Sequence, residues 1–173
     1  NNVAVAARHA QAVHGLERVA VMDFDVHHGN GTQAAFWDDP SLLYTSTHQM
    51  PLYPGTGAIG ETGIANNIVN APLAPQSDGV AFKEAMTGRI LPALDSFAPD
   101  LVIISAGFDA HYRDPLASLN FDEDDFYWAT RELMALADRV CGGRVVSCLE
   151  GGYDLQGLAT SAAAHVRALL EPC

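Results

Sequence analysis

The chain has 173 residues, of which 49% are hydrophobic and 17% are charged, and its formal net charge at pH 7 is −12. A chain of this length buries roughly 70% of its unfolded surface, so we expect a single domain over residues 1–173 with a true core. The negative charge argues against nonspecific binding to nucleic acid or to an anionic membrane, and it fits a soluble protein.

The cysteines exclude some classes of small protein. Cys141, Cys148 and Cys173 are odd in number and form no C-x-x-C pair, so we expect neither a disulfide framework nor a structural zinc cluster. Cys148 lies in an apolar run, which predicts a small buried side chain. No apolar stretch is long enough to cross a membrane and no signal segment is present, so we expect a cytoplasmic protein. The chain starts at Asn1 without Met, which predicts a fragment or a processed chain.

Hydrophobic periodicity predicts helices and strands that alternate along the chain. Helices are expected over 1–15, 31–37, within 78–97, over 122–140 and over 155–170, and strands over 19–24, 42–47, 67–71, 101–105 and 144–149. The last two strands read as buried. Pro72 should close the third strand, and Pro92 should kink or end its helix. The alternation predicts an α/β three-layer sandwich with a mostly parallel sheet.

The stretch from Val19 to Thr32 reads V-A-V-M-D-F-D-V-H-H-G-N-G-T and places polar groups where a buried strand ends. If the backbone stays extended, Asp23, Asp25 and His27 share one side of it. Burying three polar groups is costly unless something pairs with them. Carboxylate oxygen and imidazole nitrogen together suit zinc or a similar ion. The alternative is that these side chains cap the next helix or bond a loop.

Two further strand ends carry polar chemistry. Asp109 follows the strand over 101–105, and Glu150-Gly-Gly-Tyr153 follows the strand over 144–149. In sheets of this class, ligands bind beyond the carboxyl ends of the strands. We therefore expect Asp109 and Tyr153 to lie near the Asp23–His27 segment.

Five motifs occur in a fixed order along the chain: D-F-D-V-H-H-G-N-G-T, S-T-H, Y-P-G-T-G, S-A-G-F-D-A and L-E-G-G-Y. Together they resemble the zinc-dependent histone deacetylase family, and Asn30 and the G-F-D-A motif look more like class II members and bacterial deacetylase-like amidohydrolases. The resemblance covers essentially the whole chain. It implies the arginase/deacetylase fold with its N-terminal part missing, and a zinc-dependent deacetylase acting on acyl-lysine peptides or acylated polyamines.

The resemblance also implies roles for individual residues. Asp25, His27 and Asp109 would bind one catalytic zinc, which leaves an open position for water and substrate. Tyr153 would donate a hydrogen bond to the oxyanion, although an ordinary packed tyrosine is the alternative. Gly151 and Gly152 would let the Tyr153 loop approach the metal.

Less specific positions follow from the same resemblance. Leu52 and Tyr53 would form walls of the acyl-lysine channel, with a core or surface role as the alternative. A potassium ion (K⁺) would bind at Asp23, Asp25, His27, Ser46 and Thr47, partly through backbone oxygen. A second potassium site would fall near Phe36, Asp39, Leu42 and Asn67. Loop hydrogen bonding would explain the same residues.

One part of the family's machinery has no counterpart here. The family uses a tandem His-His pair as general base and acid, in a Gly-His-His motif upstream of the part matched by this chain. His27-His28 is not that pair, because His27 is assigned to zinc. Proton transfer commonly contributes ~10²–10⁴-fold, so we expect this chain to be impaired even when zinc binds.

Two alternative functions stay open at this stage. The first alternative to the deacetylase is a non-catalytic, metal-binding half-domain that folds with a partner or as an oligomer. The second alternative is a manganese ureohydrolase of the same fold. The ureohydrolase needs D-x-H-x-D and two metals, whereas the order here is D-x-D-x-H.

Overall fold

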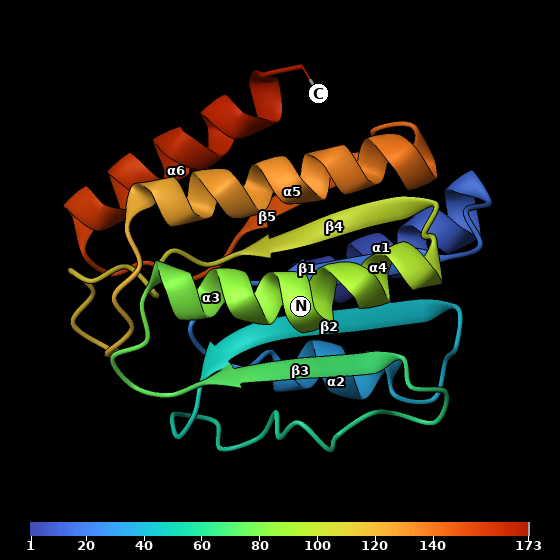
Figure 1. Ribbon diagram of the computed structural model, residues 1–173. Helices are drawn as coiled ribbons and strands as arrows, with labels where there is room; N and C mark the ends of the chain where they lie inside the picture. The colour runs from blue at the N-terminus through green and yellow to red at the C-terminus, as the bar shows by residue number, and fades with distance from the viewer. Residues whose placement is uncertain (173) are drawn as a thin grey trace.

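A computed structural model describes residues 1–172 and shows one five-stranded parallel sheet in the order β3-β2-β1-β4-β5. Figure 1 shows the strands running side by side with the helices packed along them. The strands are β1 (Val19–Asp23), β2 (Leu42–Gln49), β3 (Ile68–Leu73), β4 (Leu101–Ala106) and β5 (Val145–Leu149). The helices are α1 (Asn2–His14), α2 (Asn30–Phe36), α3 (Gly79–Ala85), η1 (Met86–Ile90), α4 (Leu91–Phe97), α5 (Glu123–Cys141) and α6 (Leu155–Leu170).

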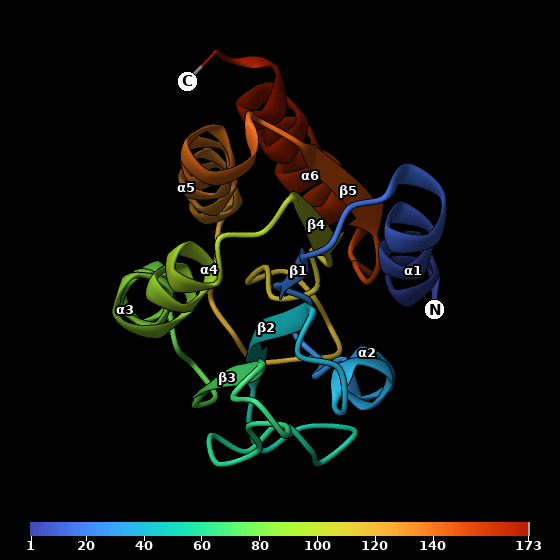
Figure 2. The ribbon, with the colours of Figure 1, turned by 90° about the vertical axis from the view of Figure 1, so that its right-hand side faces the viewer.

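Helices cover both faces of the sheet, which confirms the predicted three-layer α/β sandwich. In Figure 2 the sheet is seen end-on, with α3, α4 and α5 on one side and α1 and α2 on the other. Alternate residues of the central strand face these two layers, as the pleat requires. Ala20 and Met22 join the core under α3, η1 and α5, whereas Val19 and Val21 join the core under α1 and α2.

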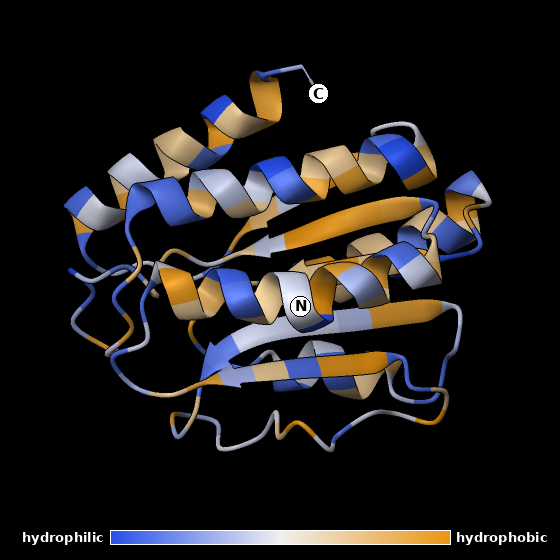
Figure 3. Ribbon diagram, in the orientation of Figure 1, coloured by the Kyte–Doolittle hydropathy of each residue, from blue (hydrophilic) through white to orange (hydrophobic). Residues whose placement is uncertain are grey.

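The strand register places polar side chains together at one edge. Asp23, the last residue of β1, lies opposite Ser46 of β2 and Ser105 of β4. Figure 3 shows β2 changing from hydrophobic at its start to hydrophilic at its carboxyl end. The strand register therefore gathers polar side chains at the carboxyl ends of the strands, where a site is expected.

Several boundaries differ from the sequence prediction. β2 runs two residues further, to Gln49, and β3 continues through Pro72 to Leu73. The prediction that Pro72 closes the strand was wrong because β3 is the edge strand, where a residue without an N–H group is tolerated. The predicted helix within 78–97 is present, but the π-helical turn η1 interrupts it directly before Leu91 and Pro92.

β5 is the second correction. Its prediction as a buried strand was wrong, since Val146 and Leu149 are 46% and 62% exposed. β5 is the second edge strand of the sheet. The apolar run over 145–149 does not distinguish a central strand from an edge strand. Cys148, expected to be buried, is half-buried. Cys173 lies outside the described residues.

The helix ends follow local sequence signals. The Asn1 side chain accepts from the backbone N–H of Ala4, and Gly15 ends α1 with a left-handed φ of 66°. Asp122 and Asp125 form a capping box at the start of α5. These polar caps satisfy backbone donors that the first turn leaves unpaired, so both predicted starts are confirmed.

A buried histidine links α5, α6 and β5. The Thr130 hydroxyl donates to the Phe126 carbonyl (2.6 Å), so it accepts from His165 Nδ1 (2.7 Å). The Ser147 hydroxyl then donates to His165 Nε2 at 2.8 Å. His165 is neutral in this arrangement, and burial lowers its pKa to about 4.

This pKa predicts a pH-dependent stability. The pKa of His165 is about 4 in the folded chain against 6.5 for an ordinary histidine, so the unfolded chain binds more protons between these values. The contribution of neutral His165 to the free energy of unfolding is complete above pH 6.5. The free energy of unfolding then falls by up to about 3 kcal/mol as the pH falls toward 4. Urea unfolding at pH 7 and pH 4.5 should show this loss in the unsubstituted chain and a smaller one in His165→Gln. An equal loss in both chains would contradict this assignment.

Candidate metal centre

The segment after β1 bends instead of staying extended. β1 ends at Asp23, and residues 25–27 form a bend. Asp23 Oδ1 accepts from the backbone N–H of Asp25 (3.1 Å), and Asp25 Oδ1 accepts from that of His27 (2.8 Å). The expectation that the backbone stays extended from Asp23 to His27 was therefore wrong. Aspartates that bond the backbone two residues on are what redirect the chain.

The bend brings Asp25 and His27 to Asp109, which follows β4. His27 Nδ1 lies 3.2 Å from Asp25 Oδ1 and 3.1 Å from Asp109 Oδ2. Potential ligand atoms of the three residues all lie within 4.8 Å of one another. We call these residues the carboxylate–histidine cluster. Because β1 and β4 are paired in parallel, their carboxyl ends deliver the three side chains to one point.

Backbone donors hold both carboxylates of the cluster. Asp109 Oδ1 accepts from the backbone N–H of Val26 at 2.9 Å, and Asp25 Oδ2 accepts from that of Gly151 at 2.9 Å. Asp109 Oδ2 keeps its contact with His27. The carboxylates are thus oriented before any metal arrives, as supporting hydrogen bonds do at metal sites.

The electrostatics of the cluster follow from burial and close charge. The hydrogen bond to Asp109 and then the one to Asp25 raise the pKa of His27 to about 10. Burial opposes ionisation of Asp25, but hydrogen bonds from His27 and Gly151 outweigh it and leave the pKa of Asp25 below its ordinary value. Burial, and then the nearby charge of Asp25, raise the pKa of Asp109. The three side chains therefore titrate together, with the imidazole held between two carboxylates.

The cluster fits a metal in its donor set. Two carboxylates and one imidazole are the ligands of a catalytic zinc site with an open position. A divalent cation bound there would offset the negative charge of the two adjacent carboxylates. Within residues 1–172 this is the one group of three or more such side chains with this spacing.

Gly151 is required by the close approach of its loop. A Cβ atom on Gly151 would collide with the Asp109 carboxylate and would lie 2.7 Å from Asp25 Oδ2. Gly152 adopts φ 143°, which side chains rarely tolerate. Both glycines therefore allow a close approach of this loop to the cluster, and their role toward a metal stays a prediction.

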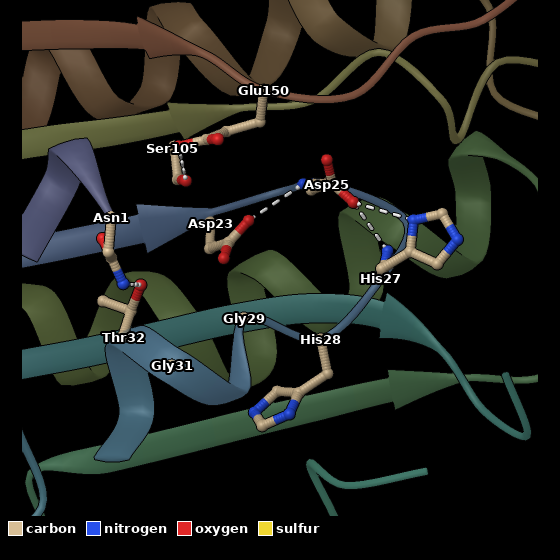
Figure 4. A pocket seen from close by; sticks show the side chains of 10 residues that line it. All are labelled: Asn1, Asp23, Asp25, His27, His28, Gly29, Gly31, Thr32, Ser105 and Glu150. Carbon is tan, nitrogen blue, oxygen red and sulfur yellow. Dashed lines mark hydrogen bonds and ion pairs between the residues drawn. The ribbon is translucent and has the colours of Figure 1, made fainter. Parts of the chain in front are cut away.

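Asp23 lies beside the cluster and not in it. It is 3% exposed, and its Oδ2 accepts from the Tyr44 hydroxyl at 3.0 Å. Burial, and then the charge of Asp25, raise the pKa of Asp23 well above its ordinary value. Figure 4 shows Asp23, Asp25 and His27 along one wall of a pocket of about 300 Å³.

The opposite wall of this pocket comes from β4 and β5. The Ser105 hydroxyl donates to Glu150 Oε1 at 3.0 Å, and both residues line the pocket. Glu150 was noted at its strand end, and Ser105 opens the S-A-G-F-D-A motif, but neither residue was predicted to line the site. The sequence also missed Tyr44, since a tyrosine in a buried strand reads as core.

His28 turns away from His27 in Figure 4. Its ring bonds Thr56 Oγ1 (2.7 Å) and Gln33 Oε1 (2.9 Å), on the side of α2 and the loop over 50–66. The ring of His28 is therefore engaged by Thr56 and Gln33 and not by the cluster.

The remaining predicted residues are placed as follows. Tyr153 follows Gly152 and is 55% exposed, and burial raises the pKa of its hydroxyl, with Asp109 and Asp25 adding to the effect. Leu52 packs against the core that includes α5, whereas Tyr53 is 80% exposed. The channel assignment of these two residues stays a prediction.

The two predicted potassium sites differ in what the structure shows. Ser46 and Thr47 are buried, and Thr47 Oγ1 has no hydrogen-bond partner within residues 1–172. At the second site the Asn67 amide donates to three backbone carbonyls, those of Phe36, Asp39 and Leu42. These hydrogen bonds show that the carbonyls converge, and the potassium assignment itself stays a prediction.

Comparison with known proteins decides the family. Residues 1–169 match the histone deacetylase domain. The chain belongs to the histone deacetylase family. It is 48% identical over 172 residues to histone deacetylase 14, chloroplastic, of Arabidopsis thaliana, covering 98% of this chain and 41% of that protein. It is 44% identical over 156 residues to a histone deacetylase-like amidohydrolase of Pseudomonas aeruginosa, covering 88% and 41%.

Solved structures of the family agree with the fold. The HDA15 HD domain superposes with a TM-score of 0.91 at 41% identity, covering 98% of this chain and 49% of that one. The histone deacetylase Clr3 gives 0.92 at 38% identity, covering 98% and 30%. These similarities confirm the arginase/deacetylase fold predicted from the motifs. The chain spans about two fifths of the Arabidopsis and Pseudomonas relatives.

Gly151 provides a test of the metal site. We expect Gly151→Ala to weaken zinc binding by about tenfold or more, because its methyl group displaces the two carboxylates that backbone donors hold. Titration calorimetry of the unsubstituted chain and the variant measures this. Gly60→Ala is the matched control, since a Cβ there meets no atom within 4 Å. Equal zinc affinity in all three chains would contradict the assignment.

Proposed function

We propose that the chain carries the metal half of a zinc-dependent amidohydrolase that removes acyl groups from acyl-lysine peptides or acylated polyamines. The observation that carries this proposal is the carboxylate–histidine cluster at the joined ends of β1 and β4. The family supplies the class of reaction, and the donor set supplies the choice of zinc.

Asp25, His27 and Asp109 would hold the ion. Zinc bound there would polarise the acyl carbonyl and lower the pKa of a water molecule. The backbone N–H groups of Val26 and Gly151 donate hydrogen bonds to the carboxylates of Asp109 and Asp25 and would keep these two ligands in place.

Tyr153 would stabilise the transition state. Its hydroxyl donates a hydrogen bond to the oxyanion that develops on the acyl carbon, so it must stay protonated. Burial and the charges of Asp109 and Asp25 raise its pKa, which keeps the donor in place. A hydrogen bond that strengthens as charge develops raises the rate and not only the affinity.

The two histidines at this site, His27 and His28, are engaged in other contacts. The two nitrogen atoms of His28 already bond Thr56 and Gln33, and His27 belongs to the cluster. The second candidate function is therefore a metal-binding half-domain without activity of its own. The ureohydrolase alternative has less support, because the chain belongs to the deacetylase family and its described residues hold one three-ligand group.

The helices, the relatives and the net charge bear on where the protein acts and on what it binds. No helix within residues 1–172 is long and apolar enough to cross a membrane. The cytoplasm stays a prediction, since the Arabidopsis relative is named as chloroplastic. Direct nucleic-acid binding is not expected at a net charge of −12, and the oligomeric state is open.

Hydrolysis of an acetyl-lysine peptide tests the proposal. We expect turnover that requires zinc and that falls about 10²–10³-fold in Tyr153→Phe, the usual cost of losing one oxyanion donor. Asp109→Ala should abolish both turnover and zinc binding, because it removes one of the three ligands. A fluorogenic assay of the deacetylated peptide measures turnover, and metal analysis measures zinc binding.

The outcomes separate the two candidate functions. Turnover that Asp109→Ala leaves untouched would contradict the amidohydrolase. Zinc bound by the unsubstituted chain without any turnover would favour the half-domain, whose missing activity lies in the proton-transfer step.

A further inference from the structure

We propose that Asp114 is a positioning residue that fixes Tyr153 relative to the metal ligand Asp109. This inference rests on the proposed function, since it concerns the oxyanion donor of that reaction. Asp114 belongs to the loop between β4 and α5, which also carries Asp109, and it was not among the site residues predicted from the sequence.

The Asp114 carboxylate binds the backbone of the Tyr153 loop directly. Its Oδ2 accepts from the backbone N–H of Tyr153 at 2.7 Å and from that of Asp154 at 3.4 Å. Its Oδ1 accepts from the backbone N–H of Leu116 at 3.0 Å. Asp114 is 8% exposed, so these are charge-assisted bonds shielded from water.

The position of Tyr153 depends on such backbone contacts. Its side chain is 55% exposed, so packing does little to hold the ring. Gly152, directly before it, adopts φ 143° and lends the segment little stiffness. A strong acceptor at the Tyr153 N–H therefore sets where the side chain begins.

Other contacts tie the same two loops together. The backbone N–H of Phe108 donates to the Gly151 carbonyl at 2.8 Å. Arg113 Nε donates to Asp154 Oδ1 at 2.9 Å, and that oxygen also caps α6 by accepting from the Gly157 N–H at 2.7 Å. Tyr153 thus lies between two attachment points, one at Gly151 and one at Asp154.

The loop that carries Asp109 and Asp114 is itself braced. The Asp114 N–H donates to the His111 carbonyl (2.9 Å), and the His111 N–H donates to the Phe108 carbonyl (3.3 Å). One bonded loop therefore supplies a metal ligand at one end and the anchor of the oxyanion donor at the other. The hydrogen bonds of this loop therefore fix the position of the Tyr153 backbone relative to Asp109. Small errors in such relative positions are costly to catalysis.

Two variants of Asp114 test this inference. Asp114→Ala removes the acceptor, whereas Asp114→Asn keeps an oxygen without the charge and guards against a variant that fails to fold. Amide hydrogen exchange of the zinc-loaded chain, followed by NMR, is the first readout. We expect the Tyr153 amide to exchange at least about tenfold faster in Asp114→Ala, with a smaller change in Asp114→Asn. Asp124→Asn, an exposed aspartate on α5, is the control and should change neither amide nor turnover.

Turnover of the acetyl-lysine peptide is the second readout. We expect kcat to fall about tenfold in Asp114→Ala with KM and zinc affinity nearly unchanged. In a Tyr153→Phe background the same substitution should have no further effect on kcat, because Asp114 acts through the Tyr153 hydroxyl.

The outcomes keep this inference separate from the proposed function. An unchanged exchange rate of the Tyr153 amide in Asp114→Ala overturns the inference, even if the chain is active. Additive losses of kcat in the double variant overturn it as well. An inactive unsubstituted chain counts against the proposed function alone, and the amide exchange still decides whether Asp114 holds Tyr153.

Discussion

The parallel pairing of β1 with β4 is the constraint on which the rest of the site depends. Each strand ends in a carboxylate-bearing turn, and the pairing brings Asp25 and His27 to Asp109 across more than 80 residues of sequence. Two carboxylates this close repel each other unless a positive charge lies between them. The His27 ring lies between them, within hydrogen-bond distance of both carboxylates, and the proposed metal ion would supply the positive charge.

The surrounding structure is arranged to keep this pair of charges in place. Backbone N–H groups from Val26 and Gly151 bond one oxygen of each carboxylate, and only glycine fits at position 151. The same glycine-containing turn leads to Tyr153, whose backbone Asp114 holds. The proposed metal ligands and the proposed oxyanion donor are therefore linked by hydrogen bonds from backbone N–H groups to buried or half-buried carboxylates.

Sequence patterns predicted the fold, and they named the three residues that the structure brings together in the carboxylate–histidine cluster. Alternating apolar runs specify a covered parallel sheet, and D-x-D-x-H followed by G-F-D places two carboxylates and an imidazole at strand ends. Patterns failed where tertiary position decides. β5 reads as buried from its apolar run but is an edge strand, and the bend after Asp23 depends on aspartate bonds to the backbone. The contacts of Ser105, Tyr44 and Asp114 were not predicted, because their partners are distant in the sequence.

X-ray absorption at the zinc edge of the zinc-loaded chain is the most direct measurement of the central claim. The account predicts one zinc per chain, bound by one imidazole nitrogen and by oxygen atoms, without sulfur. A sulfur ligand would mean that a cysteine binds the metal, and two metals per chain would mean a dinuclear site. Either result would contradict a single centre built on Asp25, His27 and Asp109.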